Sequence, residues 1–117
     1  PADARIPRTK LSPRPAGVEN TTIAVIATDA VLTKAEAKRL AIAAHDGLAR
    51  ALWPAHTPLD GDLVFALATG RSGQAPAPED FIGLCAAAAS TMARAIARGV
   101  HDAAPMAGDV LPSWAAR

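Results

Sequence analysis

The residues around position 20 pair a hydroxyl nucleophile with a bond that it could break. Residues 1–20 are rich in Pro and end in Asn20, and Thr21 opens the β-branched run TTIAVIAT. Attack of the Thr21 hydroxyl on the Asn20 carbonyl, followed by an N-to-O acyl shift and hydrolysis, would release the Thr21 α-amine. A free α-amine has a pKa of about 7.7–8.0 and can act as general base for its own hydroxyl. The spacing alone is more typical of a Thr that merely starts a strand, so both interpretations stay open.

A pair of carboxylates precedes the next apolar run. Asp60 and Asp62 flank Gly61 at the start of that run. Side chains two residues apart on an extended chain point to the same side, and two close carboxylates raise each other's proton affinity. Such a pair could orient a hydroxyl or an ammonium group, whereas the simpler interpretation is an Asp-Gly turn. Gly61 would let the backbone approach a neighbour closely or adopt a positive φ.

The three histidines are weaker candidates. His56 could join Asp60 and Asp62 around a metal ion, but this set offers too few ligands, so we expect no metal and no cofactor. His45 is expected on the face of a helix. His101 is expected at a helix C-terminus, where a cation interacts favourably with the helix dipole. The sequence therefore assigns none of the three a catalytic role.

The nucleophile and the carboxylates each stand at the start of a predicted strand. The runs at 21–28 and 62–69 are short, rich in apolar or β-branched residues, and bounded by turn residues. Neither run alternates polar with apolar residues, which predicts that both faces of each strand are buried. A sheet of two strands is marginal in water. We therefore expect further strands and a covering layer from sequence that this chain does not contain.

Two helices alternate with these strands. Thr33 and Glu36 have the spacing of a capping box, and helical apolar spacing follows until Pro54. Gly47 interrupts this helix, which indicates the close approach of a neighbour. A second helix, with an apolar stripe rich in alanine, is expected to start at position 79 or 80. The resulting order β-α-β-α predicts an α/β fold.

Composition and charge exclude several classes of protein. The 12 basic and 11 acidic residues leave a net charge of +1, unlike the strongly basic face of nucleic-acid binders. Cys85 is the only cysteine, which excludes a disulfide framework within the chain and favours a reducing, cytoplasmic setting. The longest uncharged stretch, residues 81–93, is too short to cross a bilayer. We expect neither a nucleic acid nor a membrane as a partner.

Two stretches carry a resemblance to a known family. They are ENTTIAVIATDAVLTKAEAKRLAIAAHDGLARAL, residues 19–52, and PAHTPLDGDLVFALATG, residues 54–70. Together they resemble the C-terminal part of the self-processing β-aminopeptidase-like family, the S58-type peptidases. This family includes L-aminopeptidase/D-Ala-esterases, β-peptidyl aminopeptidases and endo-acting 6-aminohexanoate-oligomer (nylon oligomer) hydrolases. The resemblance is closest to the last of these branches.

Membership in this family would imply a precursor that is cleaved into a large α and a small β subunit. The cut would fall between Asn20 and Thr21. Residues 1–20 would then be the Pro-rich end of the α subunit, and residues 21–117 would be the catalytic β segment. We expect the rest of the α subunit to lie upstream of this chain.

The same resemblance implies a site and an architecture. Thr21 would be the nucleophile, and Asp60 and Asp62 would assist it. The β-α-β-α segment would form part of a four-layer αββα sandwich. The family's oxyanion-stabilising Asn and supporting Lys belong to the α subunit, so we expect this segment alone to be inactive. The implied assembly is a homo-oligomer of αβ units that cleaves a small linear amide or peptide.

Two alternatives stay open. One is an aminopeptidase for β-amino or D-amino substrates, although those branches typically have Ser at the cleavage point. The other is a non-catalytic, degenerate paralogue that binds a partner through its exposed sheet edge.

Overall fold

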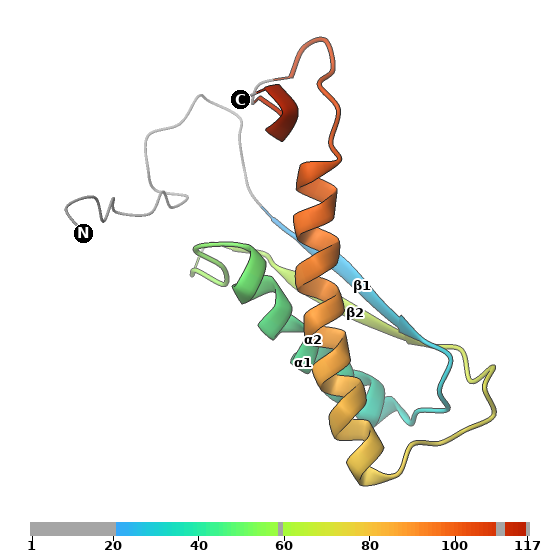
Figure 1. The fold of residues 1–117 in the computed structure, drawn as a ribbon. Coiled ribbons are helices and arrows are strands. Elements are labelled where there is room, and N and C mark those ends of the chain that lie inside the picture. The colour runs from blue at the N-terminus through green and yellow to red at the C-terminus, as the bar shows by residue number, and fades with distance from the viewer. Residues whose placement is uncertain (1–20, 59, 110–111, 117) are drawn as a thin grey trace.

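The computed structural model describes residues 21–58, 60–109 and 112–116 (Figure 1). The elements in chain order are β1 (Ile23–Thr28), α1 (Lys34–Ala51), β2 (Leu63–Ala68), α2 (Pro78–His101) and a short 3₁₀ helix (Trp114–Ala116). The predicted order β-α-β-α and the α/β class are confirmed. The predicted linker at residues 1–20, which includes Asn20, lies outside the described residues.

β1 and β2 form a parallel pair. The register places Ile23 opposite Leu63, and the pairing continues to the end of both strands. α1 provides the crossover that a parallel connection needs. Both helices lie on the same face of the pair, in front of the strands in Figure 1. Ile26 of β1 and Val64 of β2 join buried residues of both helices in a single core.

The opposite face of the sheet is apolar and exposed. We call it the open sheet face; its large side chains are between 44% and 68% exposed and belong to Ile23, Val25, Leu63, Phe65 and Leu67. The prediction that both faces of the strands are buried is therefore wrong for the described chain. Successive side chains of a strand point to alternate faces, so helices on one side cover only every second residue.

The N-terminus of α1 confirms the predicted capping box. The Thr33 hydroxyl accepts a hydrogen bond from the Glu36 backbone N–H at 3.3 Å, and the Glu36 carboxylate accepts one from the Thr33 backbone N–H at 2.7 Å. The bond from the Thr33 N–H, and then that from its hydroxyl, lower the pKa of Glu36 because they stabilise the charged carboxylate. The helix ends at Ala51, shortly before the predicted stop at Pro54.

Backbone contact between α1 and α2 occurs at Gly47. A Cβ atom at this position would lie 2.6 Å from the Met92 Cβ and would collide with the Ala89 carbonyl oxygen. The close approach predicted for this glycine is confirmed, because a residue with a side chain does not fit here. The adjacent Leu48 is 0% exposed, and Ala88 of α2 is buried in the same core.

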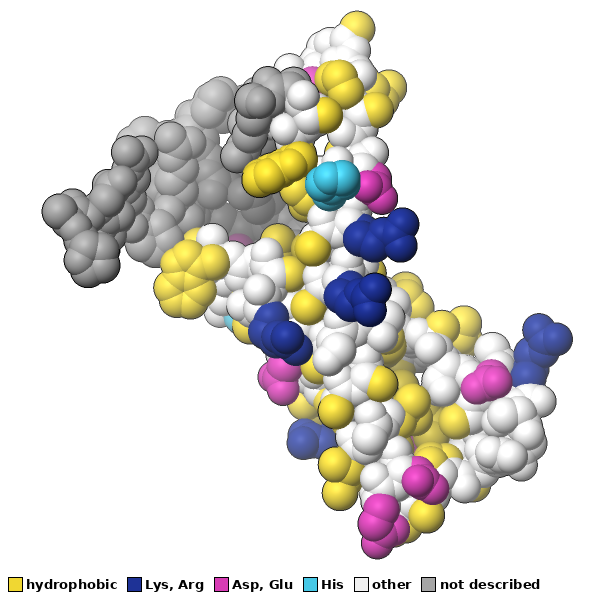
Figure 2. Space-filling model, in the orientation of Figure 1, with side chains coloured by type: hydrophobic (Ala, Val, Ile, Leu, Met, Phe, Trp, Pro, Cys, Tyr) yellow, Lys and Arg dark blue, Asp and Glu magenta, His cyan; other side chains and the backbone are white. Residues whose placement is uncertain are grey.

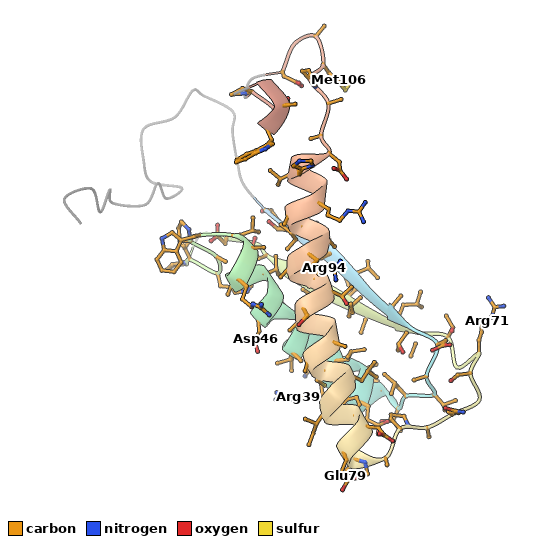
Figure 3. All side chains as sticks on the ribbon, in the orientation of Figure 1. Arg39, Asp46, Arg71, Glu79, Arg94 and Met106 are labelled. Carbon is orange, nitrogen blue, oxygen red and sulfur yellow. The ribbon has the colours of Figure 1, made fainter. Side chains whose placement is uncertain are left out.

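α2 is longer than the uncharged stretch from which the sequence argued against a membrane span. It has 24 residues and begins at Pro78, which suits the first helical turn because that position needs no N–H donor. With a mean hydropathy of 1.3 over an 18-residue window, it could cross a membrane by length and composition alone. Core helices of soluble proteins meet the same criterion. Basic side chains lie over its C-terminal half in Figure 2, and Arg94, labelled in Figure 3, is an exposed charge of this helix.

Candidate active site

The predicted nucleophile and the predicted carboxylates lie at the same end of the sheet, where both strands begin. Thr21 stands just before β1, and Asp60 and Asp62 stand just before β2. Parallel strands begin at a common edge, and the Leu63 N–H donates to the Thr22 carbonyl at 2.9 Å, so the pairing extends beyond the start of β1. The fold thus brings together two segments that are 40 residues apart in the chain.

The Thr21 side chain rests against Gly61. A Cβ atom at Gly61 would lie 3.2 Å from Thr21 Oγ1 and 3.4 Å from Thr21 Cγ2. Of the two uses considered for this glycine, close approach is the one found, since Gly61 does not have a positive φ. Thr21 is an exposed residue.

Asp62 is a buried carboxylate whose two oxygens are both bound by backbone donors. Its Oδ1 accepts the N–H of Thr22 at 2.9 Å, and its Oδ2 accepts the N–H of His56 at 3.1 Å. The side chain is only 6% exposed. Hydrogen bonds to a charged acceptor are strong, so they hold the carboxylate in one orientation. Asp62 therefore ties the residue that follows Thr21 to the loop that precedes β2.

Asp60 closes a turn in that loop. Its Oδ2 accepts the Thr57 N–H at 2.7 Å, and its own N–H donates to the Thr57 carbonyl at 2.8 Å. This turn closes before Gly61, so it is not the Asp-Gly turn of the simpler interpretation. Gly61 instead lies against the Thr21 side chain.

Two histidines to which the sequence assigned no role join this cluster. His56 Nε2 lies 3.2 Å from Nδ1 of His45 on α1, and His56 Nδ1 lies 3.7 Å from Asp62 Oδ2. Burial and then the neighbouring His56 lower the pKa of His45, against the opposite effect of Asp62 and Asp46. Spacing alone could not reveal this cluster, because it depends on a turn in which His56 has a φ of +55°.

A hydroxyl, two carboxylates and two imidazoles therefore lie near the end of the sheet where β1 and β2 begin. These groups serve in nucleophilic and general acid–base catalysis. Within the described ranges, no group of three or more His, Cys, Asp or Glu is arranged to hold a metal ion. A hydroxyl can attack a carbonyl where a base within hydrogen-bond reach takes its proton.

Comparison with known sequences identifies the class. The chain belongs to peptidase family S58, whose family model matches residues 3–111. The resemblance to S58-type peptidases is thereby confirmed. Uncharacterized aminopeptidases of Mycobacterium bovis and Mycobacterium tuberculosis are each 54% identical to it over 99 residues, or 76% of this chain. An uncharacterized aminopeptidase of Mycobacterium leprae is 64% identical over 56 residues, or 48% of this chain. The chain spans 29% of the length of the first two relatives and 16% of the third.

Proposed function

We propose that this chain is the nucleophile-bearing part of an amidohydrolase that cuts its own Asn20–Thr21 bond and then uses Thr21 to cleave other amides. The observation that carries this proposal is the contact between Thr21 and Gly61, the residue between Asp60 and Asp62, in a chain of a peptidase family.

The first reaction is intramolecular. Thr21 Oγ1 attacks the carbonyl carbon of Asn20, the peptide C–N bond breaks, and the acyl group moves to the oxygen as an ester. Water hydrolyses the ester, which leaves a carboxylate on Asn20 and a free α-amine on Thr21. Asp62 supports this geometry, because its 2.9 Å bond to the Thr22 N–H holds the backbone on the other side of the nucleophile.

The second reaction uses the liberated amine. The amine accepts the Thr21 hydroxyl proton while the oxygen attacks a substrate carbonyl, and the proton then passes to the departing amine product. An acyl-enzyme ester remains, and water activated by the Thr21 amine releases the acid product. Asp60 and Asp62 orient the amine and the hydroxyl, and they stabilise the positive charge that develops on the amine.

The open sheet face supports the larger architecture in this proposal. Exposed apolar patches of this kind mark interaction surfaces, and Val25 and Phe65 there are 61% and 54% exposed. A second sheet from the upstream α subunit would pack on it and complete a four-layer αββα sandwich. That subunit would supply an oxyanion-stabilising Asn and a supporting Lys, so residues 21–117 alone would be inactive. The αβ units would form a cytoplasmic homo-oligomer with no nucleic-acid or membrane partner.

Two substrate classes fit this mechanism. Thr as nucleophile, with the Asp60 and Asp62 pair, favours linear amides such as 6-aminohexanoate oligomers. The second candidate is an aminopeptidase for β-amino or D-amino substrates, and the names of the mycobacterial relatives favour an aminopeptidase without naming a substrate. Internal cleavage of 6-aminohexanoate oligomers against terminal cleavage of β-alanyl and D-alanyl amides separates the two. A non-catalytic paralogue would turn over neither set.

Mass spectrometry of the full-length protein tests the mechanism. We expect a fragment whose N-terminal residue is Thr21, and we expect Thr21→Ala to abolish both this fragment and amide turnover. The matched control is Thr69→Ala, at the exposed Thr that follows β2 at the opposite edge of the sheet, which should cleave and turn over normally. An intact Asn20–Thr21 bond together with retained amidase activity would falsify the mechanism.

A further inference from the structure

We propose that His56 is a positioning residue for the Thr21 reaction, which it serves by holding Asp62 with its backbone N–H and facing the same oxygen with its ring. His45 on α1 fixes the orientation of that ring. This inference rests on the proposed function, and it adds residues that neither the sequence pattern nor the family resemblance assigned.

The first support is the double approach of His56 to one oxygen atom. Its backbone N–H donates to Asp62 Oδ2 at 3.1 Å, and its ring Nδ1 lies 3.7 Å from that oxygen. The carboxylate is 6% exposed, so little water competes for it. His56 has a φ of +55°, a left-handed conformation that residues with a Cβ rarely adopt. Such conformations persist where the surroundings require them, often at functional sites.

The second support is the placement of the ring hydrogens in the histidine pair. His45 Nδ1 and His56 Nε2 are 3.2 Å apart, so one of the two nitrogens must carry the hydrogen. If His45 donates, neutral His56 keeps its own hydrogen on Nδ1, towards Asp62. If His56 is protonated, it donates to His45 and still has a hydrogen on Nδ1. The remaining arrangement would set a lone pair on Nδ1 against the carboxylate, which is unfavourable.

The consequence is that His45 makes His56 present an N–H to Asp62. Burial, and then the neighbouring His56, lower the pKa of His45, which favours the neutral imidazole at that position. The charged groups that face the pair are Asp62 and, beside His45, Asp46. An N–H directed at Asp62 offsets part of its negative potential at Thr21.

The change in potential sets the direction of a measurable effect. Asp62 Oδ1 holds the Thr22 N–H, so the carboxylate lies beside the backbone of the nucleophile. Without the His56 ring, the less compensated carboxylate would strengthen proton binding by the Thr21 amine. Turnover requires that amine in its neutral form, so the rise of kcat with pH would move to higher pH.

The experiment compares His56→Gln and His45→Gln with the control His101→Gln in the full-length protein. His101 lies at the end of α2 and pairs with Asp102 at 2.8 Å, away from the site. The probes are the p-nitroanilides of L-alanine and of 6-aminohexanoic acid, and kcat and KM are measured across pH. We expect His56→Gln to lower kcat about tenfold with KM changed less than about twofold. Its acid limb should move up by about half a pH unit.

His45→Gln should shift the limb in the same direction by a smaller amount, and His101→Gln should match the wild type. His45→Gln also provides the readout if His56→Gln fails to fold, because it leaves the loop of His56 unchanged. If the folded His56 and His45 variants share the kcat and pH profile of His101→Gln, the inference is wrong. Thr21→Ala separates the two failures: activity in that variant overturns the proposed function, whereas its loss beside an active, unshifted His56→Gln overturns only the role of His56.

Discussion

The two faces of the sheet carry similar side chains and meet different neighbours. On the covered face, Ile26 and Val64 are 8% and 6% exposed; on the open sheet face, Val25 and Phe65 are 61% and 54% exposed. Burial of such side chains is worth about 1.5–3 kcal/mol each, so an apolar face left in water forgoes much stabilisation. This segment therefore has an apolar surface on both faces of its sheet, but its own helices cover only one of them.

The largest stability effect is expected on the covered side, at Leu48→Ala. Leu48 of α1 is fully buried in the core, so its truncation should lower the free energy of unfolding by about 2–5 kcal/mol. Chemical denaturation of the full-length protein measures the loss. The control is Ile42→Ala on the same helix, where the side chain is 47% exposed and the loss should stay below about 1 kcal/mol. Equal losses at the two positions would contradict the difference in burial between them.

The corresponding substitution on the open sheet face is Leu67→Ala. Leu67 is 53% exposed on the open sheet face. If a second sheet covers this face in the full-length protein, the substitution should lower the free energy of unfolding by about 2–4 kcal/mol. Leu67→Met, which conserves volume, should cost less than about 1.5 kcal/mol. A loss for Leu67→Ala below about 0.5 kcal/mol would mean that the face stays in water and would count against the αββα sandwich.

Gly47→Ala tests how tightly the covering helices pack. The added methyl group meets the Ala89 carbonyl oxygen and the Met92 side chain, so the helices must separate. We expect a loss of about 1–3 kcal/mol in thermal or chemical unfolding. Gly99→Ala is the matched control, because no atom lies within 4 Å of a Cβ at that helical glycine. It should stabilise the protein by about 0.5–1 kcal/mol, and a similar gain at Gly47 would contradict the close approach.

The smallest expected effect is that of Thr33→Ala at the start of α1. Loss of the cap should cost about 0.5–2 kcal/mol of unfolding free energy, while Thr33→Ser keeps the hydroxyl and most of the stability.

The same cap predicts a pH dependence. The folded-state pKa of Glu36 is lowered, so its contribution is present above the usual carboxyl value of 4.5 and is lost as pH falls through the lower folded value. The unfolding free energies of the wild type and of Glu36→Gln, measured between pH 7 and pH 3, should therefore converge at the acid end. Parallel curves over this range would refute the role of Glu36.

Much of the scaffold was predictable because its signals are local. The capping box at Thr33 and Glu36 requires residues three apart, and the order of the elements follows from runs of apolar residues. The contact at Gly47 was also predicted, since a helix interior rarely tolerates glycine without a packing reason. Burial of both faces of the strands was not found, because an apolar run indicates that a strand favours burial but not which covering layers are present.

The candidate site divides along the same line. Thr21, Asp60 and Asp62 were selected from residue type, spacing and family resemblance, and the parallel pairing of β1 and β2 brings them to one edge. His45 and His56 were not selected, because their contact joins a helix face to a loop residue with positive φ. No short pattern in the chain encodes such a contact.

The strand and helix segments, the capped start of α1 and the residue types at the strand starts all follow from local sequence, because propensity, capping and periodicity act over a few residues. Packing in three dimensions was needed to establish which face of the sheet the helices cover, that the Thr21 side chain lies against Gly61, and that His56, in contact with His45, lies next to Asp62. These outcomes depend on contacts between segments far apart in the chain, and their free energy arises only when the parallel strands pair and the helices pack.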